Sequence, residues 1–321
     1  MVGNAPMVSY IVASYNYEKF IGKTIRSILD QTMNDLEVVV IDDGSSDRSR
    51  DVVRSFDDPR IRFYVNDRNM GPAWTYNRGT QLARGTYVTC LDSDDWIERQ
   101  KTEQQLDYFR RHNGVDIVGT YVKIYDKDEN RHRYAEEIER KINQPRDLDR
   151  LDIWIDENYL SAPSVMFARA LHDRIGLRDA TMTRASDYEL WTRACAHGCR
   201  FGVLPVPMLC YRAHGENASS KDVKGSFLEK SYAFQRNISP TIKNWATSSL
   251  MRMMIDWIVA HEQFTLLSER ARYQLLAFVL NPPQITPFGA FREALENAHP
   301  DPKLVSMVRH YYADDPHGPS A

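Results

Sequence analysis

The chain of 321 residues lacks the features that mark several large classes of protein. Its 41 Lys and Arg do not exceed its 44 Asp and Glu, so it shows no basic footprint for nucleic acid. No apolar run approaches the roughly 20 residues of a membrane-spanning helix. The first residues, Met1 to Pro6, contain no basic segment followed by an apolar core, so we expect no signal peptide.

Cysteine is also scarce, with four in the whole chain. This number does not indicate a disulfide framework in a protein of this length. Cys195 and Cys199 stand four residues apart, but no second pair with zinc-ligand spacing follows, so we expect reduced, packed thiols. These features favour a cytoplasmic protein. A peripheral contact with the inner face of the membrane and a homo-oligomer stay open as alternatives.

Two common glycine-rich phosphate-binding motifs are missing. The turn after the first expected strand reads Ser14-Tyr15-Asn16-Tyr17 instead of G-x-G-x-x-G, which argues against a dinucleotide-binding dehydrogenase. No G-x-x-x-x-G-K-[ST] occurs, which argues against a P-loop NTPase. A nucleotide held by carboxylates and a metal ion, without a glycine cradle, is the interpretation that is left.

Strand and helix patterns alternate in the first part of the chain. We expect strands at 8–13, 37–41, 61–65, 86–90 and 115–122, and helices at 20–29, 72–84 and 98–111. This order predicts an α/β fold with a mostly parallel sheet covered on both faces. The polar stretch 126–152 is interpreted as a loop over the sheet edge, and a later strand at 201–206 is expected to end at Pro205 and Pro207.

The pattern changes after about residue 220. Met251, Met254, Ile255 and Ile258 recur at helical spacing, and another helical pattern follows. We therefore divide the chain into an α/β domain, residues 1–219, and a small C-terminal helical domain or arm, residues 220–321. Packing of these helices against the first domain is the favoured interpretation.

Acidic residues cluster where two expected strands end. Leu91-Asp92-Ser93-Asp94-Asp95 follows one apolar strand, and Asp42-Asp43 follows another. The carboxyl ends of parallel strands form the ligand-binding edge of an open α/β sheet. Clustered carboxylates repel one another, and Mg²⁺ or Mn²⁺ would relieve the repulsion and bridge to a diphosphate. An acidic surface turn that caps the next helix is the alternative.

Several segments, taken in order, resemble glycosyltransferase family 2, whose members have the GT-A fold. The segments are 8–16, 27–32, 39–47, 69–79 and 83–95, followed by 186–191 and 211–219. Within them, 91–95 matches the D-x-D metal motif of the family. The resemblance covers roughly residues 7–219 and implies a GT-A type, mostly parallel nucleotide-binding sheet flanked by helices.

The resemblance implies which residues bind the nucleotide sugar. Asp43 matches the acid that contacts the base, usually uracil. Ala13 and Tyr15 match positions that line the nucleotide pocket. Asp92 and Ser93 match the part of the D-x-D segment that holds the ribose and the diphosphate.

The resemblance also implies a metal site. Asp94 matches the second acid of the D-x-D pair, and Asp95 and His214 match positions near the metal. Arg212, in the Y-R-x-H segment, matches a residue that reaches the donor diphosphate, as does Ser219 when a loop closes.

Asp187 matches the general base of the family, which takes the proton from the acceptor hydroxyl. A helix N-cap is its structural alternative. Two departures stand out. Ser186 replaces a frequent Glu, which puts an acidic acceptor-site partner in question. Tyr76 replaces a frequent Arg, and Arg68 or Arg78 is expected to supply the missing phosphate contact.

The resemblance thus predicts a metal-dependent inverting glycosyltransferase of the hexosyltransferase type. It would use Mn²⁺ or Mg²⁺ and a nucleotide-diphospho sugar, with a UDP-sugar favoured. The acceptor would be a glycan, a lipid-linked molecule or a protein, in cell-surface glycan or polysaccharide synthesis. A sugar nucleotidyltransferase is an alternative, although it would carry a glycine-rich loop at Ser14-Tyr15-Asn16. A non-catalytic nucleotide- or glycan-binding module is another, disfavoured by the D-x-D segment and Asp187.

Overall fold

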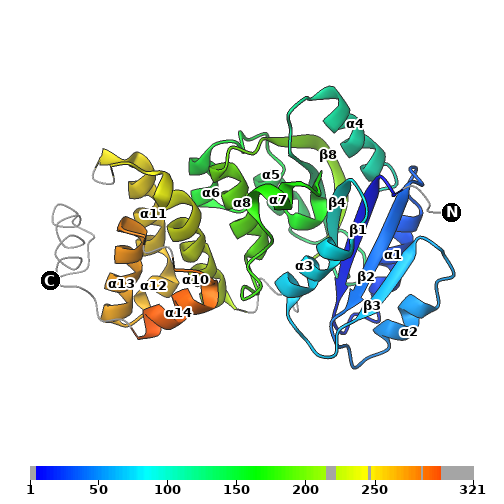
Figure 1. Ribbon diagram of the computed structural model, residues 1–321, viewed down its shortest axis with the longest axis horizontal. Helices are drawn as coiled ribbons and strands as arrows, with labels where there is room; N and C mark the ends of the chain where they lie inside the picture. The colour runs from blue at the N-terminus through cyan, green and yellow to red at the C-terminus, as the bar shows by residue number, and fades with distance from the viewer. Residues whose placement is uncertain (1–4, 215–221, 245–246, 283–284, 298–321) are drawn as a thin grey trace.

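One sheet of eight strands forms the centre of the N-terminal part of the protein in the computed structural model (Figure 1), which describes residues 5–214, 222–244, 247–282 and 285–297. The strands are arranged in the order β3-β2-β1-β4-β7-β6-β8-β5. Their bounds are β1 Val8–Ser14, β2 Leu36–Asp42, β3 Ile61–Val65, β4 Tyr87–Asp92, β5 Trp96–Ile97, β6 Ile117–Tyr125, β7 Met166–Ala168 and β8 Phe201–Arg212. Ser219 and the first residues, Met1 to Asn4, on which two of the expectations rest, lie outside the described residues.

Strands β1 to β4 form a parallel half-sheet, as predicted. β1 pairs in parallel with β2 and β4, and β2 pairs in parallel with β3. Every residue of β2 is buried, as expected for a central strand covered on both faces. The register places Ala13 opposite Asp92 and Ser14 opposite Asp42. The acidic ends of β2 and β4 therefore flank the end of β1.

The other half of the sheet is mixed. The short β7 pairs antiparallel with both β4 and β6, whereas β6 and β8 are parallel. The expectation that a strand ends at Pro205 is wrong, because β8 continues through Pro205 and Pro207 to Arg212. Its register against β6 shifts on both sides of Tyr121. Such irregularities tolerate prolines, which cannot donate a ladder hydrogen bond.

Helices cover both faces of the sheet (Figure 1). Val8, Tyr10 and Val12 of β1 face the core that contains α1 and α4, whereas Ile11 faces the core that contains α3 and α8. This alternation follows from the two-residue period of a strand. The bounds are α1 Ile21–Leu29, α2 Ser49–Arg54, α3 Pro72–Leu82, α4 Lys101–Arg111, α5 Ala135–Ile142, α6 Leu151–Asp156, η1 Ala162–Ser164, α7 Leu171–Ile175 and α8 Ser186–Ala196.

The stretch 126–152, expected to be a loop over the sheet edge, contains α5 and the start of α6. Ala135, Ile138 and Ile142 are three or four residues apart and pack against the core beneath the sheet. Because charged residues surround this narrow apolar stripe, the average polarity of the segment concealed its helical period.

The C-terminal helices gather at the end of the molecule opposite the N-terminus (Figure 1). Their bounds are α10 Val223–Ala233, η2 Phe234–Ile238, η3 Ser239–Thr241, α11 Ser249–Ala260, α12 Glu262–Thr265, α13 Glu269–Leu280 and α14 Phe288–Glu296. Their buried residues share one hydrophobic cluster with α6 and α8, and α10 packs against α8. None of the described helices combines the length and apolar character that crossing a membrane requires.

Candidate active site

A cavity of about 1250 Å³ lies at the carboxyl ends of β1, β2 and β4. Its wall also includes residues of α3, β6, α5, α8 and α10. The predicted site residues that line it are Ala13, Tyr15, Asp43, Asp92, Ser93, Asp94 and Asp187. The predicted residues outside this lining are Arg68, Asp95, Arg212 and His214.

Asp43 is fixed by the loop that follows β3. Its Oδ1 accepts hydrogen bonds from Asn66 Nδ2 (2.6 Å) and the Met70 N–H (2.9 Å). Its Oδ2 accepts one from the Gly71 N–H (2.9 Å). The carboxylate is therefore a rigid acceptor in the cavity wall.

The turns after β1 and β2 are joined by hydrogen bonds, and each turn contains a residue with a positive φ angle. Asn16 has a φ of 60° and its side chain accepts a hydrogen bond from the Ser46 N–H (2.8 Å), while its own N–H donates to Ser45 Oγ (2.9 Å). Gly44 has a φ of 80°, and a Cβ there would lie 2.7 Å from the carbonyl carbon of Arg68. Only glycine fits at this position.

Arg212 holds the acidic turn after β4 through hydrogen bonds to Asp94 and Asp95. Its backbone N–H donates to Asp95 Oδ1 (2.8 Å), and its Nε donates to the carbonyl oxygen of Asp94 (2.8 Å). Thr24 Oγ1 lies 3.0 Å and 2.6 Å from the carbonyl oxygens of Ser93 and Asp95. Arg212 is 1% exposed, so the structure places it beneath the turn and not in the cavity wall.

Asp94 and His214 form a pair at the edge of this turn. Asp94 Oδ2 lies 2.9 Å from His214 Nε2, and both side chains are largely buried. The imidazole stacks on Phe20, with ring centroids 5.7 Å apart and an angle of 21° between the planes. This stacking fixes the orientation of the ring.

Asp92 accepts a hydrogen bond from the hydroxyl of Tyr76. Burial, followed by the negative charge of Asp94, raises the pKa of Asp92 to about 6. The same two causes raise the pKa of Asp95 well above its usual value. Burial and neighbouring negative charge thus both disfavour the charged forms of Asp92 and Asp95.

The residues of this turn fit a divalent cation. Asp95 Oδ2 is buried and has no hydrogen-bond partner among the described residues. Within the described ranges, no three His, Cys, Asp or Glu side chains form a group that could hold a metal ion by themselves. Mg²⁺ is commonly held by one or two carboxylates together with substrate phosphates. A carboxylate turn with one adjacent imidazole suits that manner of binding.

Asp187 lies in the first turn of α8, where the helix dipole favours a negative charge. It is not the helix N-cap, because Ala185 occupies that position. Its Oδ2 accepts a hydrogen bond from Asn158 Nδ2 (3.1 Å). Its place in the wall of the cavity that also contains Asp92 gives it access to a bound substrate.

The loop before α8 is held by Glu229 of α10, which is 1% exposed. Its Oε1 accepts a hydrogen bond from the Thr183 N–H (2.8 Å). Its Oε2 accepts hydrogen bonds from the N–H groups of Arg184 (2.9 Å) and Ala185 (2.6 Å). A residue of the C-terminal region thus fixes the backbone that precedes Asp187.

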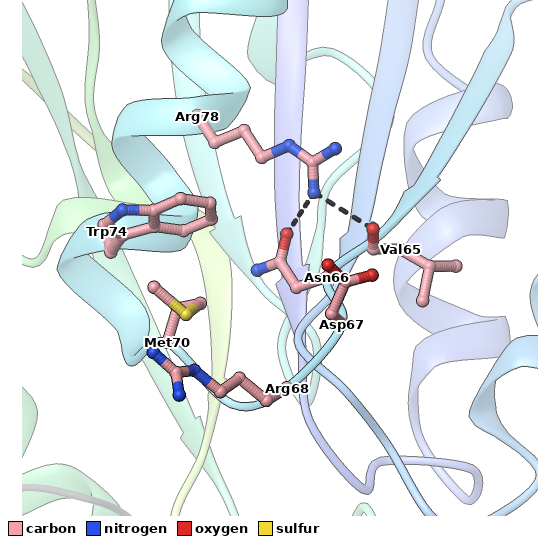
Figure 2. Close-up of a pocket in the computed structure, with 7 residues that line it drawn as sticks. All are labelled: Val65, Asn66, Asp67, Arg68, Met70, Trp74 and Arg78. Carbon is pink, nitrogen blue, oxygen red and sulfur yellow. Dashed lines mark hydrogen bonds between the residues drawn. The ribbon is translucent and has the colours of Figure 1, made fainter.

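Arg68 and Arg78 border a separate pocket of about 670 Å³ on the edge of the sheet (Figure 2). The guanidinium of Arg78 donates to the Asn66 side chain and to the carbonyl oxygen of Val65 (3.0 Å). Asn66, which lines this pocket, also donates a hydrogen bond to Asp43, which lines the large cavity. The structure therefore does not bring Arg68 into the lining of the large cavity.

The cation that lies beside Tyr76 is Arg178, 5.2 Å above the ring. Sequence reasoning missed it, together with Asn158 and Glu229. These residues reach the site through contacts between segments far apart in the chain, for which no local pattern gives a signal. The replacement of a frequent Arg of the family by Tyr76 was the one signal in the sequence that another segment could supply a cation here.

The comparisons with known proteins agree with this architecture. The model of glycosyl transferase family 2 matches residues 9–176, more than half of the chain, so the protein belongs to this family and is a glycosyltransferase. This result favours a glycosyltransferase over the alternatives of a sugar nucleotidyltransferase and of a non-catalytic module.

Individual relatives extend the match. An uncharacterized glycosyltransferase of Methanocaldococcus jannaschii is 26% identical over 241 residues, covering 73% of this chain and 81% of the relative. Chondroitin synthase of Escherichia coli is 31% identical over 225 residues, covering 67% of this chain but 30% of the relative. The crystal structure of Staphylococcus aureus TarS 1–349 with UDP-GlcNAc matches with a TM-score of 0.63 at 18% identity, covering 85% of this chain and 79% of that one. This structural likeness confirms the predicted GT-A fold.

Proposed function

We propose that this glycosyltransferase moves a sugar from a UDP-sugar to an acceptor hydroxyl, with inversion, in polysaccharide synthesis. The main observation in support is that Asp43, Asp92 and Asp94 line the same cavity as Asp187. The UDP-GlcNAc bound to TarS supports the choice of donor, and the likeness to chondroitin synthase supports a polysaccharide product.

Asp187 is proposed as the general base. It accepts the proton of the acceptor hydroxyl while the acceptor oxygen forms a bond to the anomeric carbon of the donor. The bond from that carbon to the diphosphate oxygen breaks, and the nucleoside diphosphate leaves with the bonding electrons. Attack and departure occur on opposite faces, so the anomeric configuration inverts.

The donor is proposed to bind along the sheet edge. Asp43 accepts hydrogen bonds from the base, and Ala13 and Tyr15 border it. Asp92 and Ser93 lie at the ribose and diphosphate.

A Mn²⁺ or Mg²⁺ ion held by Asp94 and His214, with Asp95 adjacent, would stabilise the negative charge of the leaving diphosphate. Arg212 is proposed to act indirectly, by holding the acidic turn. The phosphate contact predicted for Arg68, which lies outside the lining of the large cavity, stays a prediction.

We also propose that residues 1–219 form the catalytic GT-A domain and that residues 220–321 form a helical arm that positions the base. The contacts of Glu229 with the loop before α8 support this division of roles.

A thermal-stability screen of the intact protein with UDP, GDP and CDP, each with and without Mn²⁺, tests the donor class. A ligand that binds the native state raises the melting temperature by mass action. We expect a rise with UDP that depends on Mn²⁺. A shift with GDP or CDP and none with UDP would overturn the proposed donor.

A further inference from the structure

The lining of the cavity includes a second set of residues, from α5, residues 143–163, residues 178–187 and α10, which we call the helical side. Its charge is opposite to that of the sheet edge. The basic residues that line the helical side are Lys141, Arg146, Arg178, Arg184 and Lys230. The acidic residues that line it are Glu137, Glu157 and Asp187.

Arg178 is held firmly at the junction between the helical side and the sheet edge. The side-chain amide of Asn77 donates to its carbonyl oxygen (2.8 Å) and accepts from its N–H (3.0 Å). Its guanidinium lies over Tyr76, and its Nη1 is 3.4 Å from Ser186 Oγ. Arg178 is therefore an oriented cation next to the residue that precedes Asp187.

The carboxylates of Asp187 and Asp92 interact with the charge of Arg178, but one nitrogen of its guanidinium has no hydrogen-bond partner among the described residues. Arg178 is 7% exposed, and its Nη2 has no hydrogen-bond partner among the described residues. A buried donor without a partner costs about 1–3 kcal/mol, and more for a charged group. Because Arg178 lines the cavity, a bound ligand can supply the missing acceptor. A carboxylate matches the planar fork of a guanidinium better than a neutral hydroxyl does.

The other basic residues of the helical side are incompletely neutralised. Lys230 and Lys141 share one acid, Glu157, at 2.9 Å and 3.9 Å. Arg146 lies 3.7 Å above the ring of Tyr159, and its Nε has no hydrogen-bond partner among the described residues. Basic side chains thus outnumber acidic ones on the helical side, and most of them belong to segments other than the strands that end in the donor carboxylates.

We propose that the helical side binds an acceptor saccharide that carries an anionic group, a sugar carboxylate, with Arg178 as its main contact. The inference rests on the proposed function, because it takes Asp187 as the base that faces the acceptor. In that function the transferred sugar would lie nearer to Asp92 and Asp94, which are assigned to the donor. The basic lining of the helical side therefore favours the acceptor over the donor as the anionic partner.

The test uses the full chain saturated with UDP and Mn²⁺. It is titrated by calorimetry with disaccharides that end in glucuronate, galacturonate or mannuronate, each beside its carboxyl-reduced counterpart. Disaccharides that end in a sugar phosphate form a separate arm. We expect at least one uronate to bind about tenfold more tightly than its reduced counterpart, as for a charge-assisted hydrogen bond.

Variants of Arg178 test whether this residue causes the preference for a uronate. Arg178→Gln should abolish the preference, and Arg178→Lys should retain part of it. Binding of UDP that still depends on Mn²⁺ is the check that each variant keeps its donor site. Arg174→Gln is the matched control, because Arg174 is an exposed arginine paired with Asp116 outside the cavity lining. If Arg178→Gln fails to fold, Arg178→Lys and the wild-type comparison of uronates with reduced counterparts still decide.

Each contrary result has a distinct meaning. If no uronate is preferred while UDP binding stays dependent on Mn²⁺, this inference fails and the proposed function stands. A stronger preference for phosphate overturns the carboxylate assignment. A preference that survives in Arg178→Gln overturns the role of Arg178. Absence of UDP binding would instead contradict the proposed function.

Discussion

The sheet edge and the helical side of the cavity are built in different ways. At the sheet edge, Ala13, Asp43 and Asp92 stand at the ends of neighbouring parallel strands, and their order in the chain sets their positions. On the helical side, Arg178 and Asp187 are positioned by Asn77 and Glu229, which are distant in sequence. The sheet edge follows from strand topology, whereas the helical side depends on long-range side-chain contacts.

The largest effect is expected at the junction of the two parts. Asp187→Asn keeps the size of the side chain but removes the base, so sugar transfer to an acceptor should slow by about 10²–10⁴-fold. UDP binding should not change, because Asp187 is not assigned to the donor. The measurement is single-turnover transfer, with Asp173→Asn, an exposed residue of α7, as the control. Transfer at the wild-type rate would rule out Asp187 as the base.

Glu229→Gln probes the support of the helical side. The variant replaces one acceptor of the backbone N–H groups before α8 by an amide, so we expect a loss of stability of about 1–3 kcal/mol. Turnover should fall while UDP affinity is retained. Urea denaturation and UDP titration measure the two effects, and Glu262→Gln, an exposed residue of α12, is the control. Equal losses of UDP affinity and turnover would contradict the separation of the two parts.

Tyr76→Phe probes the sheet edge. The variant removes the hydrogen bond to Asp92 and leaves the ring in place. We expect UDP affinity in the presence of Mn²⁺ to fall by about tenfold, because a hydrogen bond to a charged group contributes roughly 1.5–3 kcal/mol. Tyr108→Phe, on α4 and away from the cavity, serves as the control in the same calorimetric titration. Unchanged affinity would show that Asp92 does not need this donor.

The smallest effect is expected for Lys101, a buried residue of α4 that lies outside the lining of the cavity. Lys101 is fully buried beside Gln105, and burial lowers its pKa to about 7. Between this pKa and the ordinary value of 10.5, the unfolded chain binds a proton that the folded chain does not. The unfavourable contribution of Lys101 to stability should therefore diminish as pH increases from about 7 toward 10.5, which amounts to a few degrees in melting temperature relative to a variant without this amine. The buried Cys thiols and Tyr hydroxyls, whose pKa values are raised, act in the opposite direction and are common to both proteins.

Lys101→Met should remove this pH-dependent contribution, and Lys123→Met, a partly exposed lysine paired with Glu98, should not. The melting temperature is followed by circular dichroism from neutral to alkaline pH. A wild-type curve that falls steadily over this range, with the same slope in Lys101→Met, would contradict a neutral buried lysine.

The same contrast explains what the sequence could predict. The parallel strands and the acids that end them follow from local patterns, so the α/β class, Asp43 and the Asp92–Asp94 turn were predicted. The role of Arg212 beneath that turn was not, because its hydrogen bonds are to atoms more than 80 residues away. The passage of β8 through Pro205 depends on irregular pairing with β6, which a single segment does not encode.

The most direct test of the central claim is calorimetric titration of the protein with UDP, with and without Mn²⁺, in wild type and Asp94→Ala. Asp107→Ala, a partly exposed residue of α4 outside the cavity lining, is the matched control. We expect Mn²⁺-dependent binding in wild type and Asp107→Ala, and its loss in Asp94→Ala. Equal binding without a metal ion, or unchanged binding in Asp94→Ala, would contradict a metal-assisted donor site at the end of β4.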